Sequence, residues 1–98
     1  MSVADIEQKL QSNAARFGEL GARVKFDFGE DRLLVDGTQT PATVTHDDGD
    51  ADCTLVVSPE DMQKVMDGQL DPTMAVMTGK IKLKGSTAIA MKLGSLLK

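Results

Sequence analysis

The first third of the chain changes from a helical to a strand-like spacing of apolar side chains. The helical part follows Ser2 and Asp5, an N-cap with an acid three residues later, and it ends near Gly18 or Gly21. Its apolar positions recur at intervals of three and four residues: Val3, Ile6, Leu10, Ala14 and Phe17. From residue 23 to residue 28, apolar and polar side chains alternate, which is the period of a half-buried strand. The pattern therefore predicts an amphipathic helix followed by a strand.

Three more strand-like runs follow at short intervals. They cover residues 32–35, 42–46 and 53–57, and turns rich in Asp and Gly separate them. Short turns join strands that are antiparallel neighbours. Four such runs in succession therefore predict an antiparallel meander.

Helical signals return after residue 57. Ser58 and Pro59 supply a cap and a proline at the first helical position, and Gly68 ends the predicted helix. The pair Asp71-Pro72 repeats the start signal, and Gly79 repeats the stop. We expect two short helices here, each with an apolar face that contains methionine.

A fifth strand and a last helix complete the pattern. Residues 80–84 alternate outward lysines with Ile81 and Leu83, and Gly85-Ser86 begins a helix. The apolar stripe of this helix consists of Ile89, Leu93, Leu96 and Leu97. Residues 1–98 are therefore expected to form a single α+β domain, with a five-stranded, mainly antiparallel sheet and helices packed on one face.

Methionine is concentrated in the second half of the chain. Five of the six methionines are Met62, Met66, Met74, Met77 and Met91, whereas the three aromatic residues all precede residue 30. Methionine is flexible and adapts to irregular apolar shapes. The sequence thus favours an apolar cavity in the second half, although a methionine stripe is also typical of an ordinary core.

Several short motifs in this half resemble the sterol carrier protein 2 family. They are Ala51-Asp52-Cys53-Thr54, Asp61-x4-Met66-x-Gly68, Leu70-Asp71-Pro72, the run Gly79-Lys80-Ile81-Lys82-Leu83-Lys84-Gly85, and Ala90-Met91-Lys92-Leu93. Residues 1–50 agree with the family only in the order of elements. The chain departs from the family at Val76 and Met77, where members often have a pair of phenylalanines, so this part of the tunnel is expected to be less rigid.

The resemblance implies an α+β domain whose helices and sheet enclose an apolar tunnel. Members bind and transfer fatty acyl chains, acyl-CoA, sterols or phospholipids and are not catalysts by themselves, so no cofactor, metal or catalytic residue is implied. The predicted lipid-binding residues are Met66, Leu70, Met74, Met77, Leu83 and Met91.

Composition excludes some classes of function. The net charge of −4 argues against nucleic acid as a partner, because phosphate binding requires a basic surface. No signal peptide or membrane span is recognisable, and the single Cys53 suits a reducing compartment, so we expect a cytoplasmic protein. The lysines at 80, 82 and 84 are expected to face solvent, with contact to an anionic membrane surface as the alternative.

Two other classes of function stay open. The apolar C-terminal helix would also suit a protein-interaction module that docks on a partner enzyme or on a second copy. An enzyme that uses Cys53 as a nucleophile is less favoured, because the only histidine, His46, adjoins an acidic turn. The run from His46 to Asp50 lacks the spacing of a calcium loop, so we expect a solvated turn there.

Overall fold

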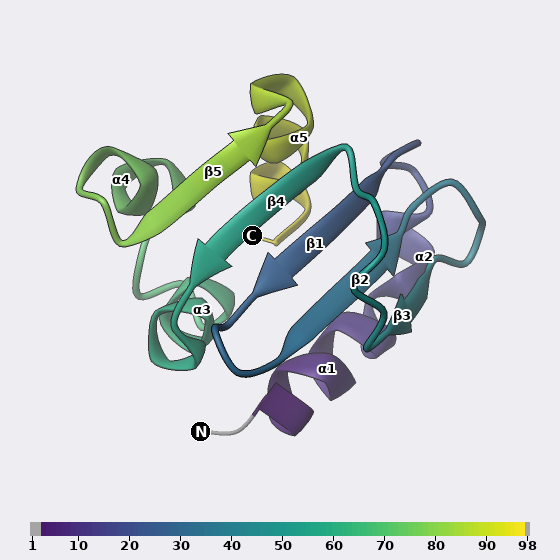
Figure 1. The fold of residues 1–98 in the computed structure, drawn as a ribbon, viewed down its shortest axis with the longest axis horizontal. Helices are drawn as coiled ribbons and strands as arrows, with labels where there is room; N and C mark the ends of the chain where they lie inside the picture. The colour runs from purple at the N-terminus through teal and green to yellow at the C-terminus, as the bar shows by residue number, and fades with distance from the viewer. Residues whose placement is uncertain (1–2, 98) are drawn as a thin grey trace.

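A computed structural model describes residues 3–97 and shows one five-stranded sheet backed by helices (Figure 1). The helices are α1 (Val3–Ser12), α2 (Ala14–Phe17), α3 (Pro59–Met66), α4 (Pro72–Met77) and α5 (Thr87–Leu97). The strands are β1 (Arg23–Asp27), β2 (Arg32–Asp36), β3 (Thr43–Thr45), β4 (Cys53–Val57) and β5 (Ile81–Gly85). In Figure 1 the sheet lies in front of α1, α2 and α5, and α4 lies beside β5. The predicted α+β fold is confirmed.

The sheet is mixed, with strand order β3-β2-β1-β4-β5. Three of its four strand pairs are antiparallel, and β1 pairs with β4 in parallel. The prediction of a mainly antiparallel, five-stranded sheet is therefore confirmed. The predicted meander holds for β1 to β3 but is wrong at β4, which adds beside β1 and not beside β3.

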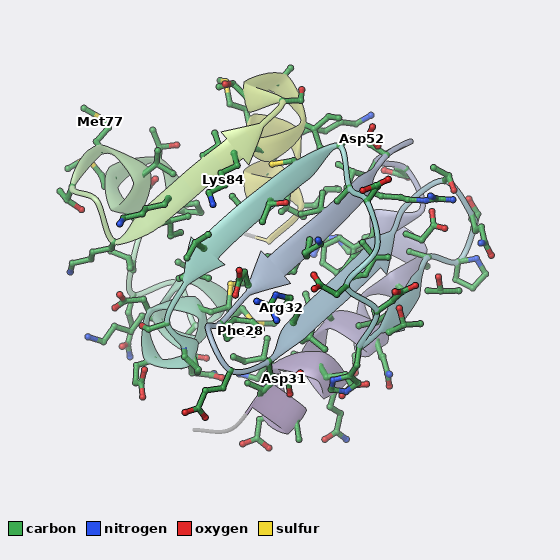
Figure 2. All side chains as sticks on the ribbon, viewed as in Figure 1. Phe28, Asp31, Arg32, Asp52, Met77 and Lys84 are labelled. Carbon is green, nitrogen blue, oxygen red and sulfur yellow. The ribbon has the colours of Figure 1, made fainter. Side chains whose placement is uncertain are left out.

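The segment between β3 and β4 crosses the face of the sheet that carries no helices. Asp48 holds it there, because its Oδ1 lies 3.0 Å from Lys25 Nζ and 3.4 Å from Arg32 Nε; Arg32 lies in front of the sheet in Figure 2. At the end of the crossing, the Asp52 amide donates to the Arg23 carbonyl at 2.9 Å, and the Arg23 amide donates to Asp52 Oδ2 at 3.0 Å. These contacts place β4 on the far side of β1, and the turn residues alone do not encode them.

The first helix is shorter than predicted. The structure ends α1 at Ser12 and begins α2 at Ala14, so the continuous helix predicted up to Gly18 or Gly21 is wrong. Asn13 lies at the break with φ −108° and ψ 17°, and its side-chain amide donates to the Lys9 carbonyl at 2.9 Å. Such side-chain bonds to the backbone compete with helix continuation. The predicted cap at Ser2 lies outside the described residues.

One hydrophobic core lies between the inner face of the sheet and the helices. Its largest side chains with almost no exposed surface come from α1, α2, the first two strands, α3 and α5: Phe17, Phe26, Ile6, Leu10, Leu33, Met62 and Leu93. Phe26 stacks on Phe28 with ring centroids 6.4 Å apart. The aromatic side chains therefore fill the core near β1 and leave the region near β5 to smaller and more flexible residues.

Candidate functional site

An apolar pocket of about 330 Å³ lies between the inner face of β4 and β5 and the three C-terminal helices. This volume falls at the lower end of the range that small-molecule sites occupy, about 300–1,000 Å³. The lining residues are Leu55 and Val57 of β4, Ile81 and Leu83 of β5, Met62 and Val65 of α3, Pro72, Thr73, Val76 and Met77 of α4, and Thr87, Ala90, Met91, Leu93, Gly94 and Ser95 of α5. The pocket therefore lies in the half of the chain in which methionine is concentrated.

Strand pairing builds the floor of the pocket. Leu55 is the register partner of Leu83, and Val57 is the register partner of Ile81. Side chains alternate across a strand, so these two pairs lie on the same inward face, and the lysines of β5 lie on the other. The floor is consequently four branched aliphatic side chains from two adjacent strands.

Local capping chemistry sets the positions of α3 and α4. The Ser58 hydroxyl accepts a hydrogen bond from the Asp61 amide at 3.1 Å, and Asp71 Oδ1 accepts one from the Thr73 amide at 2.8 Å. A proline follows each cap, at the first helical position. The predicted starts of both helices are confirmed, and these caps fix where each helix begins beside the sheet.

Gly85 directs the chain from β5 into α5. Its φ of +97° lies in the left-handed region, and a Cβ atom there would lie 2.5 Å from the Asp52 carbonyl oxygen. That oxygen accepts a hydrogen bond from the Ser86 amide at 3.0 Å, and the Ser86 hydroxyl accepts one from the Ile89 amide at 3.3 Å. A side chain at position 85 would therefore displace α5, which forms one wall of the pocket.

Among the residues that the structure describes, no charged side chain lines the pocket. Its polar side chains are the hydroxyls of Thr73, Thr87 and Ser95. Within residues 3–97, no group of three or more His, Cys, Asp or Glu could hold a metal ion. The lining therefore suits an apolar ligand that makes a few contacts with hydroxyls, because a charged group of a ligand would find no opposite charge inside the pocket.

The mouth of the pocket is bounded by exposed methionines. Met77 is 75% exposed and Met91 is 71% exposed, although both line the cavity. Figure 2 shows Met77 projecting from α4 away from the body of the molecule. The pocket is thus open to solvent between α4 and α5, and its rim is apolar.

The structure brings together three of the six predicted lipid-binding residues. Met77, Leu83 and Met91 line the pocket. Met66 and Leu70 are partly buried against the core, outside the lining, and Met74 is 52% exposed on α4.

The sequence prediction missed several lining residues on β4 and α3. Leu55 and Val57 carry a usable signal, because their alternation with polar residues matches that of Ile81 and Leu83 on the neighbouring strand. Met62 and Val65 were harder to separate from Met66, since all three are apolar and lie within five residues on one short helix. The rotation of α3 about its axis decides which of them face the pocket.

The groups with reactive side chains lie outside the pocket lining. Cys53 is 1% exposed, and burial, followed by the negative charge of Asp52, raises the pKa of its thiol. Both ring nitrogens of His46 contact carboxylates: Nε2 lies 2.7 Å from Glu7 Oε1, and Nδ1 lies 3.2 Å from Asp31 Oδ1. Cys53 is therefore a buried thiol of low reactivity. The His46 ring contacts two carboxylates outside the pocket.

Comparisons with known proteins point to one family. The sequence matches the SCP-2 sterol transfer family over residues 3–98. Sterol carrier protein 2 of Rattus norvegicus is 34% identical over 100 residues, which cover 94% of this chain and 18% of that protein. Hydroxysteroid dehydrogenase-like protein 2 of Bos taurus is 47% identical over 47 residues, which cover 48% of this chain and 11% of that protein. The chain therefore spans less than a fifth of either curated relative.

A solved structure shows the same fold. The solution structure of palmitated SCP2L2 from Aedes aegypti has a TM-score of 0.67 to this chain at 24% identity, and the match covers 99% of this chain and 95% of that one. The fold, the match over residues 3–98 and the rat relative confirm the predicted resemblance. The chain belongs to the SCP-2 sterol transfer family.

Proposed function

We propose that the chain binds apolar lipids in the pocket between β4, β5 and α3 to α5, and transfers them without catalysing a reaction. Family membership implies lipid binding and transfer. The observation that carries the proposal for this chain is the lining that residues 3–97 provide, which has no charged side chain and has hydroxyls as its polar side-chain groups. Such a lining offers an acyl chain or a sterol-like body an apolar environment and offers no acid or base for chemistry.

Burial of the hydrocarbon supplies the binding free energy. Each methylene removed from water contributes about 0.8 kcal/mol. A charged headgroup inside the pocket would meet no opposite charge, so a fatty acyl chain, an acyl-CoA or a phospholipid enters with its tail first and keeps its headgroup at the mouth. A palmitated structure in the same fold supports the acyl chain as a ligand class.

Met77, Leu83 and Met91 are the proposed ligand contacts from the predicted set. Met77 and Met91 lie at the mouth, and Leu83 lies on the floor. The assignment of Met66, Leu70 and Met74 stays a prediction from the sequence. We place the protein in the cytoplasm, in which a buried thiol such as Cys53 stays reduced; no helix within residues 3–97 is long and apolar enough to cross a membrane.

A titration with saturated fatty acids of increasing length tests the proposal. We expect saturable binding at a ratio of about one to one, with affinity rising about fourfold per methylene until the pocket is full. Native mass spectrometry of the purified protein should show lipid bound to the folded chain. Binding that does not saturate, or affinity that does not depend on chain length, would contradict the proposal.

Docking on a partner protein is a second candidate function. It is favoured by the exposed apolar side chains of α4 and α5, since such patches mark interaction surfaces. It is also favoured by the longer chains of the curated relatives, in which the matched segment is one part. A lipid-free protein that forms a complex of fixed stoichiometry with a partner enzyme or with a second copy would support this candidate against the first.

A further inference from the structure

We propose that Met77 and Met91, at the mouth of the pocket, are an oxidation site. A hydroperoxide converts their thioethers to sulfoxides, and the pocket then holds lipid more weakly. The effect on lipid affinity rests on the proposed lipid-binding function. The order in which the methionines are oxidised rests on their exposure and is measurable without any ligand in the pocket.

Exposure divides the methionines of residues 3–97 into two groups. Met62 is 1% exposed and belongs to the hydrophobic core, and Met66 packs against that core. Met74, Met77 and Met91 are 52%, 75% and 71% exposed, and they lie outside the core. An oxidant must reach the sulfur atom to convert a methionine to its sulfoxide. The second group is therefore the one that is open to oxidation in the folded protein.

Position relative to the pocket separates the exposed methionines further. Met77 and Met91 line the pocket, whereas Met74 lies on the same helix as Met77 but outside the lining. Met62 also lines the pocket but is buried. Among the methionines that the structure describes, Met77 and Met91 alone combine a place in the lining with an exposed side chain. Oxidation at these two residues therefore changes the surface that a ligand must pass and contact.

The reaction is a two-electron oxidation of sulfur. A lone pair of the thioether attacks the outer oxygen of the hydroperoxide, an S–O bond forms, and the O–O bond breaks. The proton of the transferred oxygen passes to the other oxygen, which leaves as water from hydrogen peroxide or as an alcohol from a lipid hydroperoxide. The product is a polar, chiral sulfoxide, which methionine sulfoxide reductases convert back to the thioether.

A sulfoxide at the mouth disfavours the bound state more than the folded state. In the free protein, the sulfoxide oxygens of these exposed side chains stay hydrated. A hydrocarbon chain packed against them would remove that water and offer no hydrogen bond in return. Helices α4 and α5 keep their contacts with the core through Ala75 and Leu93, which are at most 1% exposed. The oxidised chain therefore stays folded and loses affinity for lipid.

The single cysteine is a poor competitor for the oxidant. Cys53 is 1% exposed, and burial raises the pKa of its thiol. Oxidation of cysteine proceeds from an accessible thiolate. The response of the folded chain to a hydroperoxide is therefore assigned to the thioethers at the mouth of the pocket.

Peptide mass spectrometry of the oxidised whole chain locates the modification. The protein is treated either with hydrogen peroxide or with a fatty-acid hydroperoxide. We expect Met74, Met77 and Met91 to be oxidised while Met62 is intact, and bound palmitate to protect Met77 and Met91 but not Met74. If the fatty-acid hydroperoxide oxidises the two mouth residues ahead of Met74, the oxidant arrives as a ligand. Equal oxidation of all three by both reagents identifies an oxidant from solution, and either pattern supports the inference.

Fatty-acid titration of oxidised protein links the modification to affinity. The oxidised wild type should bind roughly tenfold more weakly, because a polar group is then covered by hydrocarbon. Methionine sulfoxide reductases A and B should restore the affinity. The double variant Met77→Leu/Met91→Leu keeps apolar side chains of similar volume and has no sulfur at the mouth, so peroxide should leave its affinity unchanged. Met74→Leu is the matched control and should lose affinity on oxidation as the wild type does.

Three results would overturn the inference. They are full affinity of the wild type after Met77 and Met91 are oxidised, an equal loss in the oxidised double variant, and oxidation of Met62 before the exposed methionines. A melting midpoint lowered by more than a few degrees in the oxidised protein would also overturn it, because unfolding would then explain the lost affinity. If the unoxidised protein binds no fatty acid, the proposed function falls together with the effect on affinity, and this result is distinct from the other four.

Discussion

The two ends of the same sheet are packed in opposite ways. At the β2 and β1 end, Ile6 and Leu10 of α1 and Phe17 of α2 cover the strands and pack with Phe26 of β1 in one core, and these four side chains are at most 1% exposed. At the β5 end, α4 and α5 leave a pocket of about 330 Å³ with exposed methionines at its mouth. Rigid aromatic rings fill space at one end, and flexible side chains leave it unfilled at the other. The first end therefore holds the fold together, while the second end contains the pocket in which we propose that lipid binds.

We expect the largest effect of a substitution at the β2 and β1 end of the sheet, which we call the filled end. Phe26→Ala removes a ring that is fully buried, so the free energy of unfolding should fall by about 3–5 kcal/mol. Phe28→Ala, which removes the partly buried ring stacked on it, is the matched control and should cost clearly less. Urea denaturation of both variants measures the difference. Equal losses would show that this end is not the tightly packed one.

A second pair of variants separates packing from ligand binding at the β5 end of the sheet, which contains the pocket. Leu93 is 1% exposed on α5, so Leu93→Ala should lower the free energy of unfolding by about 2–5 kcal/mol. Met91 is two residues away on the same helix and is 71% exposed. Met91→Gln should reduce affinity for saturated acyl chains and change the melting midpoint by only a few degrees.

Fatty-acid titration and thermal unfolding of both α5 variants measure these effects. Wild-type affinity in Met91→Gln, or unfolding as severe as in Leu93→Ala, would contradict the assignment of the two residues to different roles.

Substitution of Cys53 tests whether its thiol, which lies between the two ends of the sheet, is catalytic. Cys53→Ser places a hydroxyl at a position that is 1% exposed, so the protein should lose about 1–2 kcal/mol of stability. Lipid affinity should stay within a few-fold of the wild type, because Cys53 is not in the pocket lining. A turnover that disappears in this variant would instead identify the thiol as catalytic.

The smallest expected effect is a pH dependence at the filled end. Hydrogen bonds to Asp31 and Glu7 raise the pKa of His46 above its ordinary value of 6.5. The contribution of His46 to stability is therefore fully present below about pH 6.5 and is lost as the pH rises through the raised pKa. The hydrogen bond from His46, followed by one from the Arg32 amide, lowers the pKa of Asp31 below 3.8. Its contribution is present above that value and is lost in acid.

Urea midpoints at about pH 5.5 and about pH 8.5 measure the histidine part. The wild type should be slightly less stable at the higher pH, and His46→Gln should show a smaller difference between the two. The effect is small because the groups are exposed to solvent. If the pH dependence of stability persists in His46→Gln, another titratable group causes it and the assignment to His46 is wrong.

The sequence was most predictive where a local signal decides the structure. Ser58 and Asp71 marked the starts of α3 and α4, and the alternation of lysines with Ile81 and Leu83 marked β5. Caps and alternation depend on neighbouring residues only, so they can be read without knowing the rest of the fold.

The predictions from the sequence were wrong where contacts between residues that are distant in the sequence determine the structure. The parallel pairing of β4 with β1 depends on Asp48 and Asp52, which contact residues more than 20 positions earlier in the chain. The face of α3 that lines the pocket depends on how the helix rotates against the sheet, and its apolar residues permit more than one rotation. Local patterns do not contain this information.

The most direct test of the central claim is to locate a bound fatty acid by NMR with isotope-labelled methionine methyl groups. We predict nuclear Overhauser effects from the acyl chain to the methyl groups of Met77 and Met91, and none to the rings of Phe17 and Phe26. Contacts of the ligand with these rings, or saturable binding with no contact to either methionine, would contradict the account of a filled end and a ligand-binding end.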